Sequence, residues 1–322
     1  DDQPEIAGQL SQAFGVRSIP FCVMFHQGQP VDGFTGALPE AQIRQFLDKH
    51  VPSEDALEAE HETEEAEELV AEGDTDAALA KLQHAVAIDP RPTVLVAIAP
   101  STGAILAAAQ NDAANAQGPI AFTGLYPPGS TFKTVTTAAA LEKGLAKADS
   151  PEPCPGTVTI ENRTIPNEDK FDLGTVPLEQ AFAHSCNTTM GALADKLPAD
   201  ALPNTAKNLG IGVDFVIPGI TTVTGKVPNA DTPAQRVENG IGQGTVTVSP
   251  FGLAVAEASL AHGSTITPTL LPGQQTTASA PSTPIDQPTA DALRAMMRLT
   301  VTDGTASALK DIDGLGGKTG TA

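Results

Sequence analysis

The chain has 322 residues, of which 40% are hydrophobic and 4% aromatic, and its formal net charge is −21. This length allows two or three domains of roughly 100–200 residues each. The strong negative charge argues against a nucleic-acid partner, because phosphate groups are bound mainly by Lys and Arg. No apolar run is long enough to span a bilayer, and no signal peptide opens the chain, so we expect any membrane anchor to lie outside it.

The charge is divided unevenly along the chain. Residues 1–90 hold 19 acidic and 4 basic side chains, whereas residues 91–322 hold 20 acidic and 14 basic ones. Such a contrast suggests two parts with separate histories. The three cysteines, Cys22, Cys154 and Cys186, form neither a Cys-x-x-Cys pair nor a metal-type cluster. We therefore predict no metal site, and the cysteines do not indicate a redox compartment.

The first part, residues 1–50, reads as a small α/β piece. Phe21 to Phe25 and Val31 to Phe34 are compact strand candidates that would pair as a hairpin, and residues 39–49 form an amphipathic helix pattern. The stretches Gly15–Phe21 and Gly33–Gly36 resemble the cis-proline segment and the following turn of thioredoxin folds. The resemblance covers only the second half of such a fold, and the half that carries the Cys-x-x-Cys pair is absent. We interpret Cys22 as a buried strand residue without thiol–disulfide exchange activity.

Residues 51–90 predict an acidic pair of helices, at about 54–73 and 75–88, with a break at Gly73-Asp74. The second helix carries small and apolar residues in an order that resembles one tetratricopeptide repeat unit: Ala77, Ala78, Leu82, Ala85 and Ile88. Together with the thioredoxin-like piece, this resemblance implies a cytosolic N-terminal segment and a surface for protein partners. The alternative is that the acidic run is only the solvated face of a helix.

At residues 90–92 the composition changes, and an apolar strand, Thr93 to Ala99, is followed by a returning strand, Ala104 to Ala109. Pro127-Pro128-Gly129 then leads into a helix pattern from Thr131 to Lys143 that ends at Gly144. Further on, we predict a strand pair near residues 158 and 163, helices at 178–184, 188–197, 250–262 and 289–302, and a surface loop at 268–288.

Ser130 lies at the start of the first of these helices, and Lys133 follows on the same helix face. A hydroxyl beside an amine can be a nucleophile beside its base, provided that burial keeps the amine neutral. The pattern is weak by itself, because Ser307 and Lys310 form a second copy. Taken alone, Ser130 could be a helix cap and Lys133 a solvated helix residue.

Two further short motifs occur once each, Ser185-Cys186-Asn187 and Lys318-Thr319-Gly320. Alone, the first could cap the next helix and the second could be a lysine in a glycine-rich turn. A phosphate-binding loop before Lys318 is excluded, because Ile312 stands where that motif needs glycine. A Ser-His-Asp hydrolase is excluded as well, because Ser130 lacks the Gly-x-Ser-x-Gly elbow.

The three motifs follow one another in the order Ser-x-x-Lys, Ser-x-Asn, Lys-Thr-Gly, with serines 55 residues apart and Lys318 another 133 residues on. This ordered set resembles the penicillin-recognising serine enzymes. Over about residues 91–322 the likeness is to a class B penicillin-binding protein of actinobacterial type, a D,D-transpeptidase. It rests on four strings: Tyr126–Lys133, Ile241–Gly244, Asp303–Ala306 and Gly317–Ala322.

The resemblance implies acyl transfer on peptidoglycan stem peptides that end in D-Ala-D-Ala, and acylation by β-lactams. By this likeness Ser130 is the nucleophile, Lys133 its base and Ser185 a proton relay, whereas Asn187, Lys318, Thr319 and Thr321 hold the substrate. No metal or cofactor is needed. The reaction would take place outside the cytoplasmic membrane, at the cell wall.

Three other functions compete with this interpretation. A D,D-carboxypeptidase or a β-lactamase would share the motifs, but class A β-lactamases have Asp where this chain has Cys186 and use a glutamate that is absent between Asn187 and Glu238. A non-catalytic chaperone or scaffold would place the function in the N-terminal part.

The predicted fold is therefore a multidomain α/β and α+β protein. It consists of a partial thioredoxin-like piece (1–50), a helical pair (51–90) and a transpeptidase domain (91–322) in which helices flank a sheet. The family's sheet continues beyond the Lys-Thr-Gly strand, so we expect this domain to be truncated there. A composite chain joined near Asp89–Arg91 would explain the conflict between a cytosolic N-terminal part and a wall enzyme.

Overall fold

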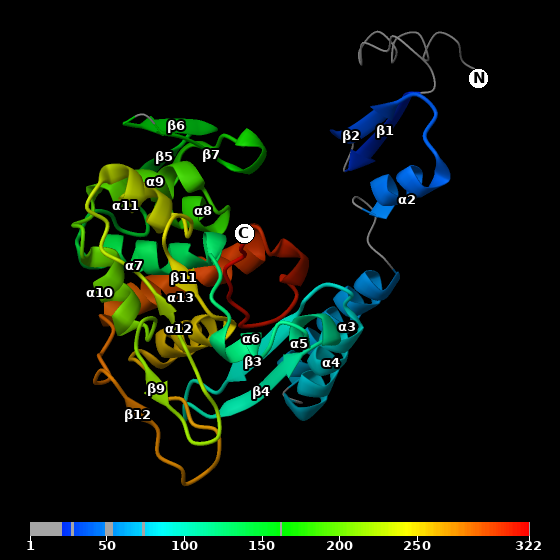
Figure 1. Ribbon diagram of the computed structural model, residues 1–322. Coiled ribbons are helices and arrows are strands. Elements are labelled where there is room, and N and C mark those ends of the chain that lie inside the picture. The colour runs from blue at the N-terminus through cyan, green and yellow to red at the C-terminus, as the bar shows by residue number, and fades with distance from the viewer. Residues whose placement is uncertain (1–20, 27–28, 49–53, 73–74, 162, 322) are drawn as a thin grey trace. The chain divides into compact units, whose positions relative to one another are not determined.

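A computed structural model describes residues 21–26, 29–48, 54–72, 75–161 and 163–321 (Figure 1). The chain divides into two compact units, Asp1–Leu57 and Glu58–Ala322. The predicted cis-proline segment before Phe21 and the predicted helix break at residues 73–74 lie outside the described residues. Within the described residues, no helix is long and apolar enough to cross a membrane.

The first unit contains the predicted hairpin and helix. Strands β1 (Phe21–His26) and β2 (Gln29–Thr35) pair antiparallel, and α2 (Glu40–Asp48) follows. The Phe34 ring meets the edge of Phe46 on α2, with 5.1 Å between ring centroids. Cys22 is exposed, so the prediction that it is buried is wrong. A two-stranded hairpin with one helix covers too little surface to bury every strand residue.

The helical pair consists of α3 (Glu54–Glu72) and α4 (Thr75–Ile88), which confirms the two predicted helices. Lys81 of α4 forms ion pairs with Glu62 (3.0 Å) and Glu65 (2.5 Å) of α3. On its other side α4 packs against the strand pair β3 (Val94–Ile98) and β4 (Ile105–Gln110), as Figure 1 shows. One face of α4 is therefore covered by this hairpin.

One buried side chain, that of Asn111, fixes the junction between α4 and β3. Its Nδ2 donates to the carbonyl oxygens of Asp89 (2.7 Å) and Arg91. Its Oδ1 accepts from the backbone N–H groups of Thr93 (3.2 Å) and Ala114 (2.9 Å), and the latter bond caps α5 (Asp112–Asn115). The chain on both sides of the junction is thus bound to a single amide.

The β3–β4 hairpin forms as predicted, and α6 (Ile120–Thr123) and α12 (Pro250–His262) pack on it. The Phe251 ring of α12 lies between those of Phe122 and Phe215, at centroid distances of 5.8 and 6.5 Å. Ser249 caps the start of α12 and Gly263 ends it in a left-handed conformation, which explains why its predicted bounds are confirmed.

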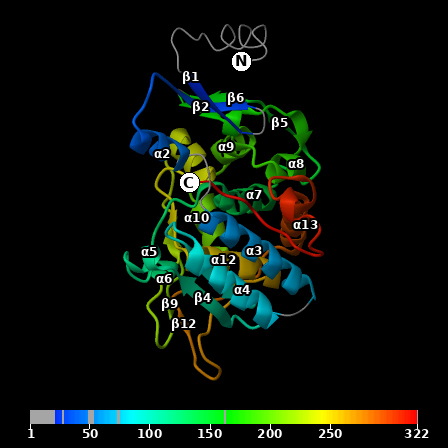
Figure 2. The ribbon, with the colours of Figure 1, turned by 90° about the vertical axis from the view of Figure 1, so that its right-hand side faces the viewer.

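Helix α7 (Lys133–Glu142) lies in the middle of a group of helices and is buried from Lys133 to Ala140 (Figure 2). Its alanines allow close approach of neighbouring helices. The other members of the group are α8 (Leu178–Ala183), α9 (Asn187–Lys196), α10 (Ala201–Asn208), α11 (Pro233–Gly240) and α13 (Gln287–Asp303). We predicted α8, α9 and α13, but not the short α10 and α11.

The described strands form six two-stranded ladders rather than one larger sheet. Besides the hairpins named above, β5 (Pro151–Cys154) pairs with β8 (Gly174–Pro177), β6 (Thr157–Ile160) with β7 (Arg163–Pro166), β9 (Phe215–Val216) with β12 (Thr277–Ala278), and β10 (Gly225–Lys226) with β11 (Thr247–Val248). The β6–β7 pair confirms the strands predicted near residues 158 and 163.

The segment around Lys318 belongs to no helix and no ladder, so the predicted strand is absent there. Among the described residues it has no neighbouring strand with which to pair. Other bonds hold the chain that leads to it: Gly317 N–H donates to Met297 O (3.1 Å), and Arg298 Nη1 donates to Ile312 O and Leu315 O (2.8 Å each).

Candidate active site

Ser130 lies in a short 3-10 helix, η1 (Gly129–Phe132), which leads directly into α7. The stretch Ile241–Gly244 supports this turn backbone to backbone, because Gly129 N–H donates to Gly242 O (2.9 Å). A Cβ atom on Gly242 would lie 1.7 Å from Gly129 O, so only glycine fits there. The glycine-rich motif therefore helps to fix the serine.

Lys133 is fully buried, one turn after Ser130. Its Nζ lies 2.9 Å from Ser130 Oγ, and it donates to Ser185 O (2.6 Å) and Asn187 Oδ1 (2.5 Å). Burial lowers the pKa of Lys133 well below its usual range; the nearby Lys318 charge lowers it further, and the Glu168 charge opposes both. A neutral amine beside a serine hydroxyl can accept its proton.

Ser185 lies between α8 and α9 with a left-handed backbone conformation (φ +59°), which is uncommon for a residue other than glycine. Its Oγ is 3.0 Å from Lys133 Nζ and 3.0 Å from Lys318 Nζ. This hydroxyl thus connects the two lysines. Asn187 is the first residue of α9, and its Nδ2 donates to Pro166 O (3.0 Å).

A disulfide joins Cys154 of β5 to Cys186, the residue between Ser185 and Asn187, with 6.1 Å between their Cα atoms. Sequence reasoning missed this bond, because the two cysteines are 32 residues apart and nothing in the local pattern pairs them. The available signal was the likeness to a wall enzyme, since disulfides persist in oxidising compartments. The bond fastens the Ser-x-Asn motif to a neighbouring strand.

Lys318 completes the group from the C-terminal side. Besides Ser185 Oγ, its Nζ contacts Thr319 O (2.9 Å) and lies 5.7 Å from the Phe182 ring centroid. Burial lowers the pKa of Lys318 from 10.5 to about 8, against the opposing effect of the Glu257 carboxylate. The chain then passes close to η1, because a Cβ on Gly320 would lie 2.7 Å from Thr131 Cγ2.

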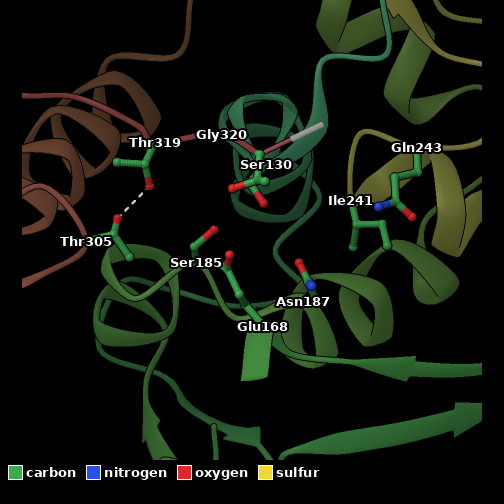
Figure 3. Close-up of a pocket in the computed structure, with 10 residues that line it drawn as sticks. Ser130, Glu168, Ser185, Asn187, Ile241, Gln243, Thr305, Thr319 and Gly320 are labelled. Carbon is green, nitrogen blue, oxygen red and sulfur yellow. Dashed lines mark hydrogen bonds between the residues drawn. The ribbon is translucent and has the colours of Figure 1, made fainter. Parts of the chain in front are cut away.

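These groups surround a pocket of about 560 Å³ (Figure 3). Five of the seven predicted site residues line it: Ser130, Ser185, Asn187, Thr319 and Thr321. Lys133 and Lys318 contact Ser185 from behind that lining. The structure therefore brings all seven together.

Five pocket residues were not predicted as site residues: Glu168, Ile241, Gln243, Thr305 and Gly320. Ile241, Gln243, Thr305 and Gly320 belong to the motif strings of the family likeness, but the likeness gave them no role of their own. The Thr305 hydroxyl lies 2.6 Å from that of Thr319. Glu168 belongs to no motif, and no sequence signal indicated it.

The family described as the penicillin binding protein transpeptidase domain matches residues 93–322. The chain belongs to this family. Peptidoglycan D,D-transpeptidase PbpA of Mycobacterium tuberculosis is 31% identical over 207 residues, which are 54% of this chain and 41% of that protein. PbpA of Mycolicibacterium smegmatis is 33% identical over 202 residues, 52% and 40% of the two chains. The chain thus spans about two fifths of the length of these relatives.

Solved structures of the penicillin-binding protein family have the same fold. The D,D-transpeptidase domain from Eggerthella lenta matches with a TM-score of 0.58 and 28% identity, over 68% of this chain and 63% of that one. Penicillin-binding protein A from M. tuberculosis, solved as an imipenem acyl-enzyme, matches with a TM-score of 0.57 and 26% identity, over 67% and 59%.

A second and shorter match is to thioredoxins. Thioredoxin 1 from Nostoc sp. is 41% identical over 51 residues, which are 16% of this chain and 44% of that protein. The likeness to thioredoxin is confirmed as a partial one, covering less than half of that fold.

Proposed function

We propose that this protein is a peptidoglycan D,D-transpeptidase that is acylated on Ser130 by stem peptides ending in D-Ala-D-Ala and by β-lactams. The observation that carries the proposal is the buried Lys133, whose Nζ lies 2.9 Å from Ser130 Oγ and whose pKa is held low by burial. Relatives named as D,D-transpeptidases, and a family member solved as an imipenem acyl-enzyme, support the same chemistry.

In the acylation step, neutral Lys133 takes the proton of Ser130 Oγ as this oxygen bonds to the carbonyl carbon of the penultimate D-Ala. The backbone N–H groups of Ser130 and Thr321 would stabilise the oxyanion that develops. Ser185, which contacts Nζ of Lys133, passes the proton to the departing nitrogen. The peptide C–N bond then breaks and terminal D-Ala leaves.

The substrate carboxylate would bind to protonated Lys318 and to the hydroxyls of Thr319 and Thr321. Asn187 orients Lys133 by accepting a hydrogen bond from Nζ. Its Nδ2, which donates to Pro166 O, would exchange this partner for a substrate carbonyl.

We place the transpeptidase part on the extracytoplasmic side of the membrane. The Cys154–Cys186 disulfide supports this location, because such bonds are rare in reducing compartments. The cytosolic location of the N-terminal segment, its likeness to a tetratricopeptide unit and its protein partners remain predictions.

Labelling with a fluorescent penicillin, followed by peptide mapping, tests the proposal. We expect a single adduct on Ser130, which Ser130→Ala abolishes and Ser307→Ala leaves intact. An adduct on Ser307, or no covalent adduct on the folded protein, would overturn it.

A further inference from the structure

Glu168 is the one charged side chain among the ten described residues that line the active-site pocket. It begins the short 3-10 helix η2 (Glu168–Lys170), just after β7. In Figure 3 its carboxyl group points into the pocket, between Ser185 and Asn187. The proposed acylation step gives it no role.

The backbone that carries Glu168 is firmly held. The preceding residue, Asn167, is buried, and its Nδ2 donates to Pro155 O and Phe171 O (2.9 Å each). Its Oδ1 accepts from the Thr188 N–H at the start of α9 (3.1 Å). The turn is therefore fixed to the helix that presents Asn187, next to the Cys154–Cys186 disulfide.

The carboxylate itself is exposed and makes no hydrogen bond or ion pair with any described residue. Its negative charge nevertheless reaches the reacting group, because it acts to raise the pKa of Lys133. On another part of the lining are Thr319 and Thr321, beside the Lys318 cation. The pocket thus has a cationic region and a separate anionic one.

We propose that Glu168 binds the amine of the acceptor peptide. The inference rests on the proposed function, in which Lys318 binds the carboxylate of the donor peptide. A transpeptidase must take a second substrate, a primary amine that is an ammonium ion at neutral pH. A carboxylate that has no partner among the described residues, on a fixed turn in the pocket of Ser130, suits a cation of this kind.

The acceptor nitrogen then displaces Ser130 from the acyl-enzyme. The bound ammonium loses one proton to solvent, and the free nitrogen attacks the carbonyl carbon of the Ser130 ester. As the C–N bond forms, positive charge develops on nitrogen, and Glu168 stabilises it. Nitrogen gives its extra proton to neutral Lys133, which passes it to Ser130 Oγ as the C–Oγ bond breaks.

The competing role for Glu168 is to activate water and so hydrolyse the acyl-enzyme. A general base must hold its water within hydrogen-bond reach in a defined pose. Among the described residues, the Glu168 carboxylate has no hydrogen-bonded partner that would help to hold a water molecule beside it. Amine binding agrees better with this exposure.

The partition of the acyl-enzyme between amine and water tests the inference. A thiolester of an acylated D-alanine serves as donor and Nα-acetyl-lysine amide as acceptor. For Glu168→Gln we expect the ratio of aminolysis to hydrolysis to fall about tenfold, the usual weight of one charge-assisted hydrogen bond. Asp169→Asn is the matched control, because Asp169 is the next acid along the chain, is exposed and does not line the pocket; its ratio should not change.

An unchanged ratio in Glu168→Gln, or a selective loss of hydrolysis, would overturn amine binding. A second measurement separates this outcome from failure of the proposed function. In Ser130→Ala, which cannot be acylated, NMR titration with Nα-acetyl-lysine amide should show binding that the added Glu168→Gln change weakens about tenfold. Equal binding in both variants would refute the inference, whether or not the unmodified protein forms an acyl-enzyme.

Discussion

The two Ser-x-x-Lys copies in this chain share a spacing and little else. Ser307 and Lys310 lie in and after η3 (Ser307–Leu309), and both are exposed. Ser130 opens onto a pocket, and Lys133 is fully buried with oxygen partners on three residues. The same four-residue pattern is thus a solvated surface turn in one place and a candidate nucleophile with its base in the other.

The reactivity of a Ser-x-x-Lys pair therefore comes from its surroundings and not from the pattern. Lys310 is exposed to solvent, whereas Lys133 has exchanged water for the Ser185 and Asn187 oxygens and a second lysine. Those partners come from segments 52 to 185 residues away, and Gly242 fixes the turn from yet another. Loss of Lys133 or of any one of these surrounding groups should therefore be measurable.

Removing the base should have the largest effect. Lys133→Ala is expected to slow acylation by a fluorescent penicillin about 10³-fold, the usual contribution of a general base, whereas Lys310→Ala should leave the rate unchanged. Because a cavity could unfold the helix core, Lys133→Met keeps the buried length without the amine, and a thermal melt verifies folding. If a folded Lys133→Met protein is acylated at near the unmodified rate, Lys133 is not the base, and the two Ser-x-x-Lys copies do not differ in the way proposed.

Removing the second lysine should cost less. Lys318→Ala is expected to slow acylation roughly tenfold to a hundredfold, the weight of one charge-assisted contact to a carboxylate.

The pH dependence of the acylation rate should also show the role of the Lys318 charge. In the proposed mechanism acylation needs neutral Lys133, so the rate should rise from acid pH. It also needs protonated Lys318, so the rate should fall above pH about 8, the pKa of that group.

Arginine at position 318 supplies the matched control, because a guanidinium stays protonated throughout this range. Lys318→Arg should therefore lose the alkaline fall in acylation rate while keeping the acid limb. A constant rate for the unmodified protein from pH 7 to 10 would contradict the role of the Lys318 charge.

The disulfide should matter mainly for stability. Replacing Cys154 and Cys186 by serine opens a loop closed over 32 residues, and the chain-entropy relation gives a loss of about 3–4 kcal/mol in unfolding free energy. Acylation should slow only a few-fold, because Ser185 becomes less firmly positioned. Urea unfolding measures the first effect, and Cys22→Ser is the control, since Cys22 is a free, exposed thiol.

Glu257 should have the smallest effect. Burial raises its pKa from 4.5 to about 7, so the folded protein holds a proton there that the unfolded chain has lost. The stability that this group contributes is therefore lost as pH rises from about 4.5 to 7. Glu257→Gln should flatten that part of the plot of unfolding free energy, measured in urea, against pH.

The same substitution should also change the acylation rate. Without the Glu257 charge the pKa of Lys318 falls, so the alkaline fall in acylation rate moves to lower pH.

The elements that sequence predicted well have clear ends or clear periodicity. Helix α12 has Ser249 and Pro250 at its start and Gly263 at its end. The β3–β4 hairpin consists of two apolar runs on either side of the turn Pro100–Gly103. Helices α10 and α11 were missed because Pro203 interrupts one and Pro233 and Gly240 confine the other to eight residues.

Within the site, only the closeness of Ser130 and Lys133 followed from spacing along the chain. The meeting of Ser185 with Lys318 came from a family likeness, because nothing local brings residues 133 positions apart into contact. Glu168 and the Cys154–Cys186 bond depend on how β5, β7 and α9 pack together. Sequence patterns do not contain such contacts, so they were missed.

The Asn111 amide has a consequence for where this domain physically starts. The family match begins at Thr93, yet Asn111 Nδ2 is satisfied by carbonyl groups of Asp89 and Arg91, which come earlier. A fragment cut at the family boundary would leave that buried amide without acceptors, at a cost of about 1–3 kcal/mol, and would uncover the face of the hairpin that α4 packs on. The border of the family match and the border of the packed structure therefore differ, and α4 belongs to the packed structure.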